Sequence, residues 1–183
     1  MMRVLDIRIS TVAARAILLA LAAGLVGSEA SAETIRIVAL GASNTYAQAV
    51  STSEAWPAKL EAMLKAKGYD VSVSVKGVTR GDANEILSAA GSIPDGTRVV
   101  VYDVGGGNSR ERGVDPATVR PQIEQAIRAH GAKAVFASYK QIAGAEPGPG
   151  WIANDPHHHI TAASHTRVAA SVLPRVVAAI GKK

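Results

Sequence analysis

The sequence contains no cysteine, and this absence excludes two kinds of covalent attachment. Neither a disulfide framework nor a lipid-modified cysteine anchor can form. A run of basic residues is also missing, because the formal charge of +5 comes from Lys and Arg that are scattered among acidic residues. We therefore expect no nucleic-acid partner, and only a mild attraction to anionic surfaces or substrates.

The sequence also lacks an apolar run long enough to cross a membrane. The apolar stretch at residues 16–26 is shorter than the about 20 residues that a spanning helix needs. Arginines precede this stretch, and an Ala30-Ser31-Ala32 motif follows it. This pattern predicts a secretory signal peptide at residues 1–32, cleaved near Ala32, with an uncleaved anchor helix as the alternative. We expect a bacterial periplasmic or secreted protein without a stable membrane anchor after cleavage.

Patterns for cofactors and metals are weak or absent. The glycine run at residues 105–107 lacks the Gly-x-Gly-x-x-Gly spacing and a following Lys-Ser/Thr pair, so it is a weak phosphate-binding signal. Three histidines stand in a row at residues 157–159. Adjacent side chains in an extended chain point to opposite faces, so we do not expect the three to bind one ion. The sequence predicts no cofactor and no metal.

Aliphatic runs alternate with amphipathic stretches along residues 33–183, which we expect to form one domain. Continuous or alternating aliphatic residues predict strands at residues 35–40, 71–75, 98–104 and 134–138. The strict alternation at 71–75 is typical of a strand near a sheet edge. Asp115 and Thr161 are expected to cap the third and the last of four helices. This order predicts an α/β fold with a parallel sheet covered by helices on both faces.

Polar residues follow these strands at the points where the strands end. Ser43 follows the first strand, Gly81-Asp82 the second and Gly107-Asn108 the third. The histidines lie in a long loop at residues 139–160, and loops of this length are often functional. Ser43 alone would be read as a turn residue or helix cap. Together, these loops supply what acyl transfer requires, which is a nucleophile, a base and donors for an oxyanion.

The motifs at these positions resemble those of the SGNH (GDSL-type) hydrolases. The first block appears as Gly41-Ala42-Ser43-Asn44, in which Ala42 replaces the usual aspartate. Gly81-Asp82 is similar to the second block, Gly107-Asn108 to the third, and residues 159–162 with His165 to the last. The resemblance covers nearly all of residues 33–183. It implies a flavodoxin-like three-layer α/β/α sandwich and the hydrolysis of esters or thioesters, as in the bacterial periplasmic thioesterase/arylesterase-like branch.

The resemblance implies a role for each matching residue. Ser43 is expected to be the nucleophile and His159 the general base. The oxyanion hole is expected to consist of the backbone N–H groups of Ser43 and Gly81 and the side-chain amide of Asn108. Loss of one such donor typically lowers the rate by about 10²–10³.

The triad acid departs from the family pattern, which is Asp-x-x-His. Asp155 lies four residues before His159 and three before His158. We expect Asp155 to be the acid, and two pairings remain open, with the residues that follow favouring His159 as the base. If Asp155 reaches neither ring, the enzyme would be slow or would orient its base through a water or a carbonyl.

The predicted function is that of a serine esterase acting on a small-molecule substrate, a short-chain acyl ester or thioester, with lysophospholipase-like activity included. An alternative is a catalytically weak or inactive protein of the same fold that binds acyl or carbohydrate ligands. A flavodoxin-like nucleotide binder is a third hypothesis. The sequence sets no oligomeric state.

Overall fold

A computed structural model describes residues 33–181 of the chain. The predicted signal peptide and its cleavage site at Ala32 lie outside the described residues. The elements follow one another as β1 (Ile35–Gly41), a 3₁₀ helix η2 (Thr52–Glu54), α2 (Trp56–Ala66), β2 (Val71–Gly77), α3 (Ala83–Ala90), β3 (Thr97–Tyr102), α4 (Gly106–Glu111), α5 (Pro116–Ala129), β4 (Lys133–Phe136), α6 (Tyr139–Ala143) and α7 (Ala162–Ile180).

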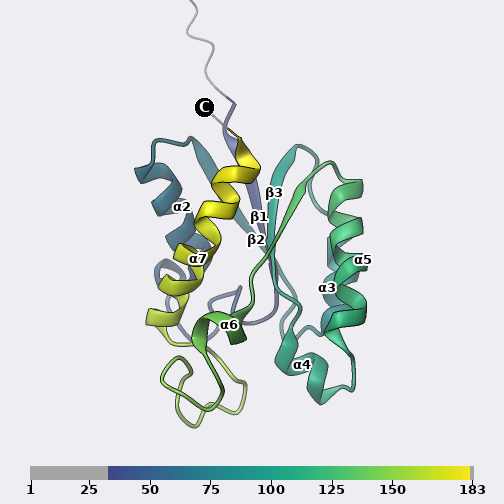
Figure 1. Ribbon diagram of the computed structural model, residues 1–183, viewed down its shortest axis with the longest axis vertical. Coiled ribbons are helices and arrows are strands. Elements are labelled where there is room, and N and C mark those ends of the chain that lie inside the picture. Colours follow the sequence, from purple (N-terminus) through teal and green to yellow (C-terminus); the bar gives the residue numbers. More distant parts are fainter. Residues whose placement is uncertain (1–32, 182–183) are drawn as a thin grey trace, which may run out of the picture. The chain divides into compact units, whose positions relative to one another are not determined.

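The strands form one four-stranded sheet in the order β2-β1-β3-β4. Every neighbouring pair is parallel. Figure 1 shows α2 and α7 on one face of this sheet and α3 and α5 on the other. The predicted α/β architecture, with a parallel sheet covered on both faces, is therefore confirmed.

The apolar run of β1 is continuous because both of its faces are buried. Ile37 and Ala39 belong to the core between the sheet and the α2/α7 layer. Val38 and Leu40 belong to the second core, on the side of α3 and α5. All four residues are at most 2 % exposed. The central strand that leads to Ser43 is thus fixed from both sides by packed side chains.

The second strand lies at the edge of the sheet, as its alternating sequence predicts. Among the described strands it pairs only with β1, and its Val75 is 42 % exposed. The Glu61 carboxylate accepts a hydrogen bond from the backbone N–H of Val73 at 2.8 Å. This contact covers part of an edge that would otherwise present unpaired backbone groups.

Side-chain caps start the helices that flank the carboxyl edge of the sheet. Asp115 accepts from the backbone N–H of Ala117 at the start of α5, and Thr161 from that of Ser164 at the start of α7, so both predicted caps are confirmed. Asp82 caps α3 and also binds Arg112 at 3.1 Å. These caps fix the points at which the loops enter the helices.

Two segments expected to be irregular contain helices. Gly105 adopts a left-handed conformation with φ of 55°, and α4 begins immediately after it, so that Asn108 lies on a helix rather than in a loop. The segment 139–160 contains α6 and an isolated antiparallel bridge between Trp151 and Ile160. Within residues 33–181, no helix combines the length and apolarity required to cross a membrane.

Candidate active site

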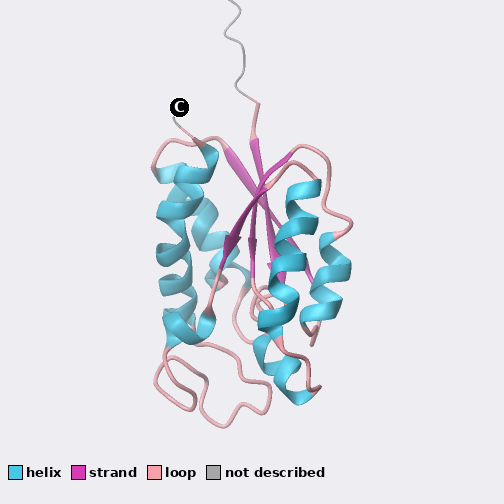
Figure 2. Ribbon diagram, turned by 45° about the vertical axis from the view of Figure 1, so that its right-hand side comes forward, coloured by secondary structure: helices cyan, strands magenta, loops and turns pink. Residues whose placement is uncertain are grey.

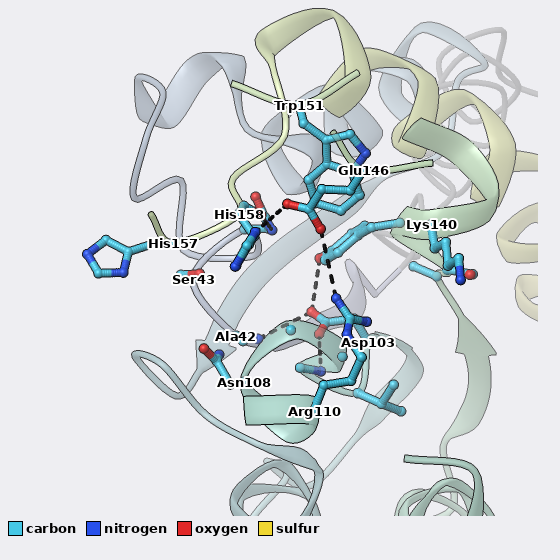
Figure 3. Close-up of a pocket in the computed structure, with 18 of the residues that line it drawn as sticks. Ala42, Ser43, Asp103, Asn108, Arg110, Lys140, Glu146, Trp151, His157 and His158 are labelled. Carbon is cyan, nitrogen blue, oxygen red and sulfur yellow. Dashed lines mark hydrogen bonds and ion pairs between the residues drawn. The ribbon is translucent and has the colours of Figure 1, made fainter. Parts of the chain in front are cut away.

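The carboxyl ends of the strands lie at one edge of the sheet, where α4, α6 and the loop before α7 gather (Figure 2). A pocket of about 410 Å³ opens at this edge, which is the usual ligand site of open α/β sheets. Figure 3 shows its lining. The polar side chains of the lining are Ser43, Asn44, Asp103, Asn108, Arg110, Ser138, Tyr139, Lys140, Glu146, Trp151, His157 and His158.

Ser43 lies in the turn directly after β1 and lines the pocket. Its carbonyl accepts hydrogen bonds from the backbone N–H groups of Tyr46 and Gln48, at 3.1 and 3.2 Å. Neither its hydroxyl nor its own N–H has a hydrogen-bond partner among residues 33–181. The Ser43 hydroxyl and N–H, which are the two groups that an acyl transfer would use, are therefore free of hydrogen bonds to residues 33–181. Ser43 itself is only 6 % exposed.

The structure pairs Asp155 with His159. One carboxylate oxygen of Asp155 accepts from the backbone N–H of His159 at 2.9 Å and lies 2.6 Å from its ring Nδ1. The same oxygen therefore fixes both the position of the residue and the rotation of its ring. An ionised carboxylate can only accept hydrogen bonds, so Nδ1 carries a proton, and in the neutral imidazole Nε2 then presents its lone pair.

A turn absorbs the extra residue between Asp155 and His159. The backbone N–H of His158 donates to the Asp155 carbonyl at 3.3 Å, and that of His157 to the Asp155 carboxylate at 3.0 Å. His158 itself has a positive φ of 59°. A left-handed residue at this point turns the chain back toward Asp155, so that the fourth residue, not the third, meets the carboxylate.

Electrostatics favour an ionised Asp155, and the second ring nitrogen of His159 is left without a hydrogen bond within residues 33–181. Burial would raise the pKa of Asp155, but hydrogen bonds from the His157 and His159 backbone N–H groups outweigh it and hold the pKa below its usual value. His159 is 4 % exposed, and its Nε2 is a buried nitrogen without a hydrogen-bond partner in the described part of the chain. Buried polar atoms are nearly always paired, so an unpaired one calls for an explanation, such as a catalytic role.

Asn44 joins the turn of Ser43 to the loop of His159. Its side-chain oxygen accepts from the backbone N–H of Ile160 at 3.0 Å, and its amide donates to the carbonyl of His158 at 3.4 Å. The residue after the serine thus binds the chain on both sides of the histidine. The sequence gives no signal for this bridge, because its ends are 114 and 116 residues apart.

His158 belongs to a different cluster. Its Nδ1 lies 2.5 Å from a Glu146 carboxylate oxygen, and its Nε2 lies 3.8 Å from Glu111. Glu146 also lies 3.8 Å from the guanidinium of Arg110 (Figure 3). His158 therefore lines the pocket with Glu146, a residue that the sequence did not single out, and its ring is not bonded to Asp155.

The three predicted oxyanion donors differ in their availability. The Ser43 N–H is unoccupied, and the Asn108 amide lines the pocket while donating one hydrogen to the Gly81 carbonyl at 3.1 Å. An amide nitrogen carries two hydrogens, so the second is available. The N–H of Gly81 donates to the Val78 carbonyl at 2.9 Å, and Gly81 does not line the pocket. It would have to leave or share that bond to act as a donor.

A buried carboxylate that the sequence analysis missed lies beside Ser43. Asp103 follows β3 directly, is 3 % exposed, and accepts hydrogen bonds from the N–H groups of Ala42 and Gly105. Burial raises the pKa of Asp103, and its hydrogen bonds oppose that rise. Its place as the first charged residue after a buried strand was a usable signal.

No group of three potential metal ligands occurs within residues 33–181.

Comparisons with known proteins connect this arrangement to one fold family. No family model matches the sequence, and no curated protein matches it. Solved structures do match. TesA superposes with a TM-score of 0.64 and 19% sequence identity, over 79% of this chain and 99% of TesA. A member of the lipolytic G-D-S-L family from Veillonella parvula has a TM-score of 0.56 at 14% identity, over 77% of this chain and 97% of that protein.

An enzyme is among these structural relatives. The psychrotrophic esterase EstA from Pseudoalteromonas superposes with a TM-score of 0.52 at 11% identity, over 77% of this chain and 96% of EstA. At such identities the likeness concerns the fold. The chain therefore has the fold of the SGNH/GDSL-type hydrolase structures, and the resemblance noted in its motifs is confirmed at that level.

Proposed function

We propose that this protein is a serine hydrolase of the SGNH type that cleaves short-chain acyl esters or thioesters. The observation that supports it most directly is the Asp155–His159 pair, whose loop Asn44 bonds to the turn of Ser43, with His159 Nε2 left without a hydrogen-bond partner among residues 33–181. A paired acid, a base with a free lone pair and an unpartnered serine are the parts that covalent acyl transfer requires.

In the proposed reaction, the Ser43 hydroxyl attacks the acyl carbonyl while His159 Nε2 takes its proton. Asp155 stabilises the imidazolium that forms and keeps its ring oriented. His159 then returns the proton to the leaving alcohol or thiol, which departs as the acyl-enzyme forms. A water, deprotonated by the same nitrogen, attacks the acyl-enzyme and restores Ser43.

The tetrahedral intermediates carry a negative oxygen that must be stabilised. The Ser43 N–H and the second hydrogen of the Asn108 amide are free to donate to it. Gly81 would join them only if its N–H gave up the bond to Val78. Fixed donors aimed at a developing charge are usually the largest single contribution to such catalysis.

The pocket supports a small substrate. Its volume of about 410 Å³ suits a short acyl group and a modest leaving group. We further propose that the protein acts in the periplasm or outside the cell, on the basis of the signal-peptide pattern at residues 1–32. Fractionation of a bacterial host that expresses the full chain tests the location.

The chemistry is tested by reaction of residues 33–183 with a fluorophosphonate, followed by intact-mass analysis and peptide mapping. We expect one adduct, on Ser43, because only an activated serine reacts quickly. The adduct should be lost in Ser43→Ala and His159→Ala and kept in His158→Ala. Loss in His158→Ala with retention in His159→Ala would transfer the role of base to His158. A folded protein that forms no adduct would favour the alternative, a ligand-binding protein of this fold.

A further inference from the structure

The proposed reaction assigns no role to one buried carboxylate at the site, that of Asp103. Asp103 is hydrogen bonded to neither His159 nor the Ser43 hydroxyl, yet it lines the pocket and is only 3 % exposed. Burial of a carboxylate is costly unless hydrogen bonds compensate it. Asp103 is compensated by four donors from three parts of the chain, and the identity of these donors indicates what it does.

One oxygen of Asp103 binds on both sides of the nucleophile. Its Oδ2 accepts from the backbone N–H of Ala42 at 3.2 Å and from the hydroxyl of Thr45 at 2.8 Å. Ala42 precedes Ser43 and Thr45 follows it by two residues. The turn that presents Ser43 is thus held at both ends by one atom.

The other oxygen of Asp103 binds the start of the helix that carries Asn108. Its Oδ1 accepts from the backbone N–H of Gly105 at 2.7 Å, and Gly105 is the left-handed residue from which α4 begins. A single carboxylate therefore joins the turn of the nucleophile to the helix of the oxyanion donor. No other described side chain binds both segments.

Two neighbours fix the carboxylate itself. The Tyr139 hydroxyl lies 2.9 Å from Oδ2, and the indole N–H of Trp56 donates to that hydroxyl at 3.0 Å. A Cβ on Gly41 would lie 1.8 Å from the same Oδ2. The end of β1 therefore needs glycine, because the carboxylate occupies the space that a side chain would fill.

We propose that Asp103 is a positioning residue, which sets the distance and orientation between Ser43 and Asn108 without touching the substrate. The inference rests on the proposed function. Misplacement of reacting groups by about 1 Å can lower a rate about 10²-fold, so a fixed link between nucleophile and oxyanion donor affects turnover more than binding. The position of Ala42, where the related hydrolases have an acid, leaves Asp103 as the carboxylate that holds this turn.

The test uses Thr45, because its hydroxyl binds Asp103 while the residue does not line the pocket. Thr45→Val removes the hydrogen bond to the carboxylate, together with the 2.8 Å contact between the Thr45 and Tyr139 hydroxyls, and keeps the size of the side chain. Thr45→Ser restores the hydroxyl. Thr97→Val is the matched control: Thr97 is also buried, and its hydroxyl donates to the Pro94 carbonyl at 2.6 Å. It lies at the start of β3, at the opposite end of the sheet.

The measurements are kcat and KM on 4-nitrophenyl acetate, the rate of fluorophosphonate labelling and the melting temperature. We expect Thr45→Val to lower kcat and the labelling rate about tenfold, with KM within about twofold of the parent, since the lost bond acts on positioning rather than binding. Thr45→Ser should recover most of the rate. Thr97→Val should lower the melting temperature by a similar amount and leave kcat unchanged.

A second variant extends the test to the carboxylate. Asp103→Asn should lower kcat about 10²-fold. Both oxygens of Asp103 accept hydrogen bonds, so the NH₂ group of an asparagine would face a donor on one side and lose those bonds. If that variant fails to fold, the Thr45 variants still test the positioning role of Asp103. Parent-like kcat in a folded Thr45→Val, or an equal loss of kcat in Thr97→Val, would overturn the positioning role alone. A parent that neither turns over the ester nor labels would overturn the proposed function, and this inference with it.

Discussion

The side-chain amide of Asn44 is hydrogen bonded to the peptide groups on both sides of His159. It accepts from the N–H of Ile160 at 3.0 Å and donates to the carbonyl of His158 at 3.4 Å. The Gly-Asp-Ser-Leu motif that this block resembles has leucine after the serine, and an aliphatic side chain cannot make either bond. In this protein the turn of Ser43 therefore binds the loop of His159 directly, through the residue next to Ser43.

Asn44→Leu removes both bonds while keeping a side chain of similar size. We expect the fluorophosphonate labelling rate to fall about tenfold, because two bonds that contribute about 1 kcal/mol each would no longer hold His159 in place. Asn44→Asp keeps the acceptor for Ile160 and should lose less. Labelling of Asn44→Leu at the parental rate would show that the loop holds its position without the bridge.

Asp155→Asn tests the orienting acid. The neutral amide can no longer stabilise the imidazolium and can present an N–H to Nδ1, which would favour the wrong tautomer of His159. We expect kcat on 4-nitrophenyl acetate to fall by up to about 10⁴-fold with the fold retained. Glu146→Gln is the matched control, since it changes the acid beside His158 in the same way. If the two variants lost activity equally, the assignment of His159 as the base would be wrong.

Asn108→Ala tests the oxyanion hole. The change removes the amide that lines the pocket and its bond to the Gly81 carbonyl. We expect kcat to fall about 10²–10³-fold while KM changes little, because the oxyanion exists only in the transition state and the tetrahedral intermediates. Asn108→Asp separates charge from shape, since a carboxylate would repel the oxyanion, and it should be slower still. A parental kcat in Asn108→Ala would remove this residue from the oxyanion hole.

His165 makes stability depend on pH. His165 is 1 % exposed, and its ring Nδ1 accepts a hydrogen bond from the backbone N–H of Trp56 at 3.2 Å. Burial, with Lys59 nearby, lowers the pKa of His165 to about 4. In the unfolded chain this histidine has an ordinary pKa of about 6.5. Between pH 6.5 and pH 4 it is therefore protonated in the unfolded chain but not in the folded one. The contribution of His165 is therefore fully present above about pH 6.5 and is lost as the pH falls toward 4.

Urea unfolding at pH 7.5 and pH 5 measures this effect. We expect the free energy of unfolding of the parent to fall by on the order of 2 kcal/mol between these values. In His165→Gln the fall should be smaller, because the variant has nothing to protonate at this position. His130→Gln is the control, because His130 is a half-buried residue at the C-terminal end of α5, on the opposite face of the sheet from α7, which carries His165 (Figure 1), and its variant should show the same fall as the parent. An unchanged slope in His165→Gln would contradict the argument.

The sequence predicted what depends on local pattern. The aliphatic run of β1, the alternation in β2 and the caps Asp115 and Thr161 are properties of short segments, and each appears in the structure as expected. The gathering of Ser43 and Asn108 at one edge followed from a parallel sheet, whose strands all end on the same side.

Other features of the site depend on backbone angles or on distant segments, which spacing does not determine. Counting residues left His158 and His159 both possible, because the left-handed φ of His158 decides which ring faces Asp155. Glu146 meets His158 through the path of a loop, and Gly81 turns its N–H to Val78 through a local turn. Such three-dimensional relations leave no regular trace in the sequence.

The hydrogen bond between Asn44 and Ile160 spans 116 residues, and it sets the order in which activity can arise during biosynthesis. The ribosome releases the serine early and the histidine much later, several seconds apart at about 5–20 residues per second. A nascent chain that holds only the first strands contains Ser43 but not His159, the base of the proposed reaction. On that mechanism, the growing polypeptide cannot hydrolyse esters until the segment that carries His159 has been made and has folded against the turn of Ser43.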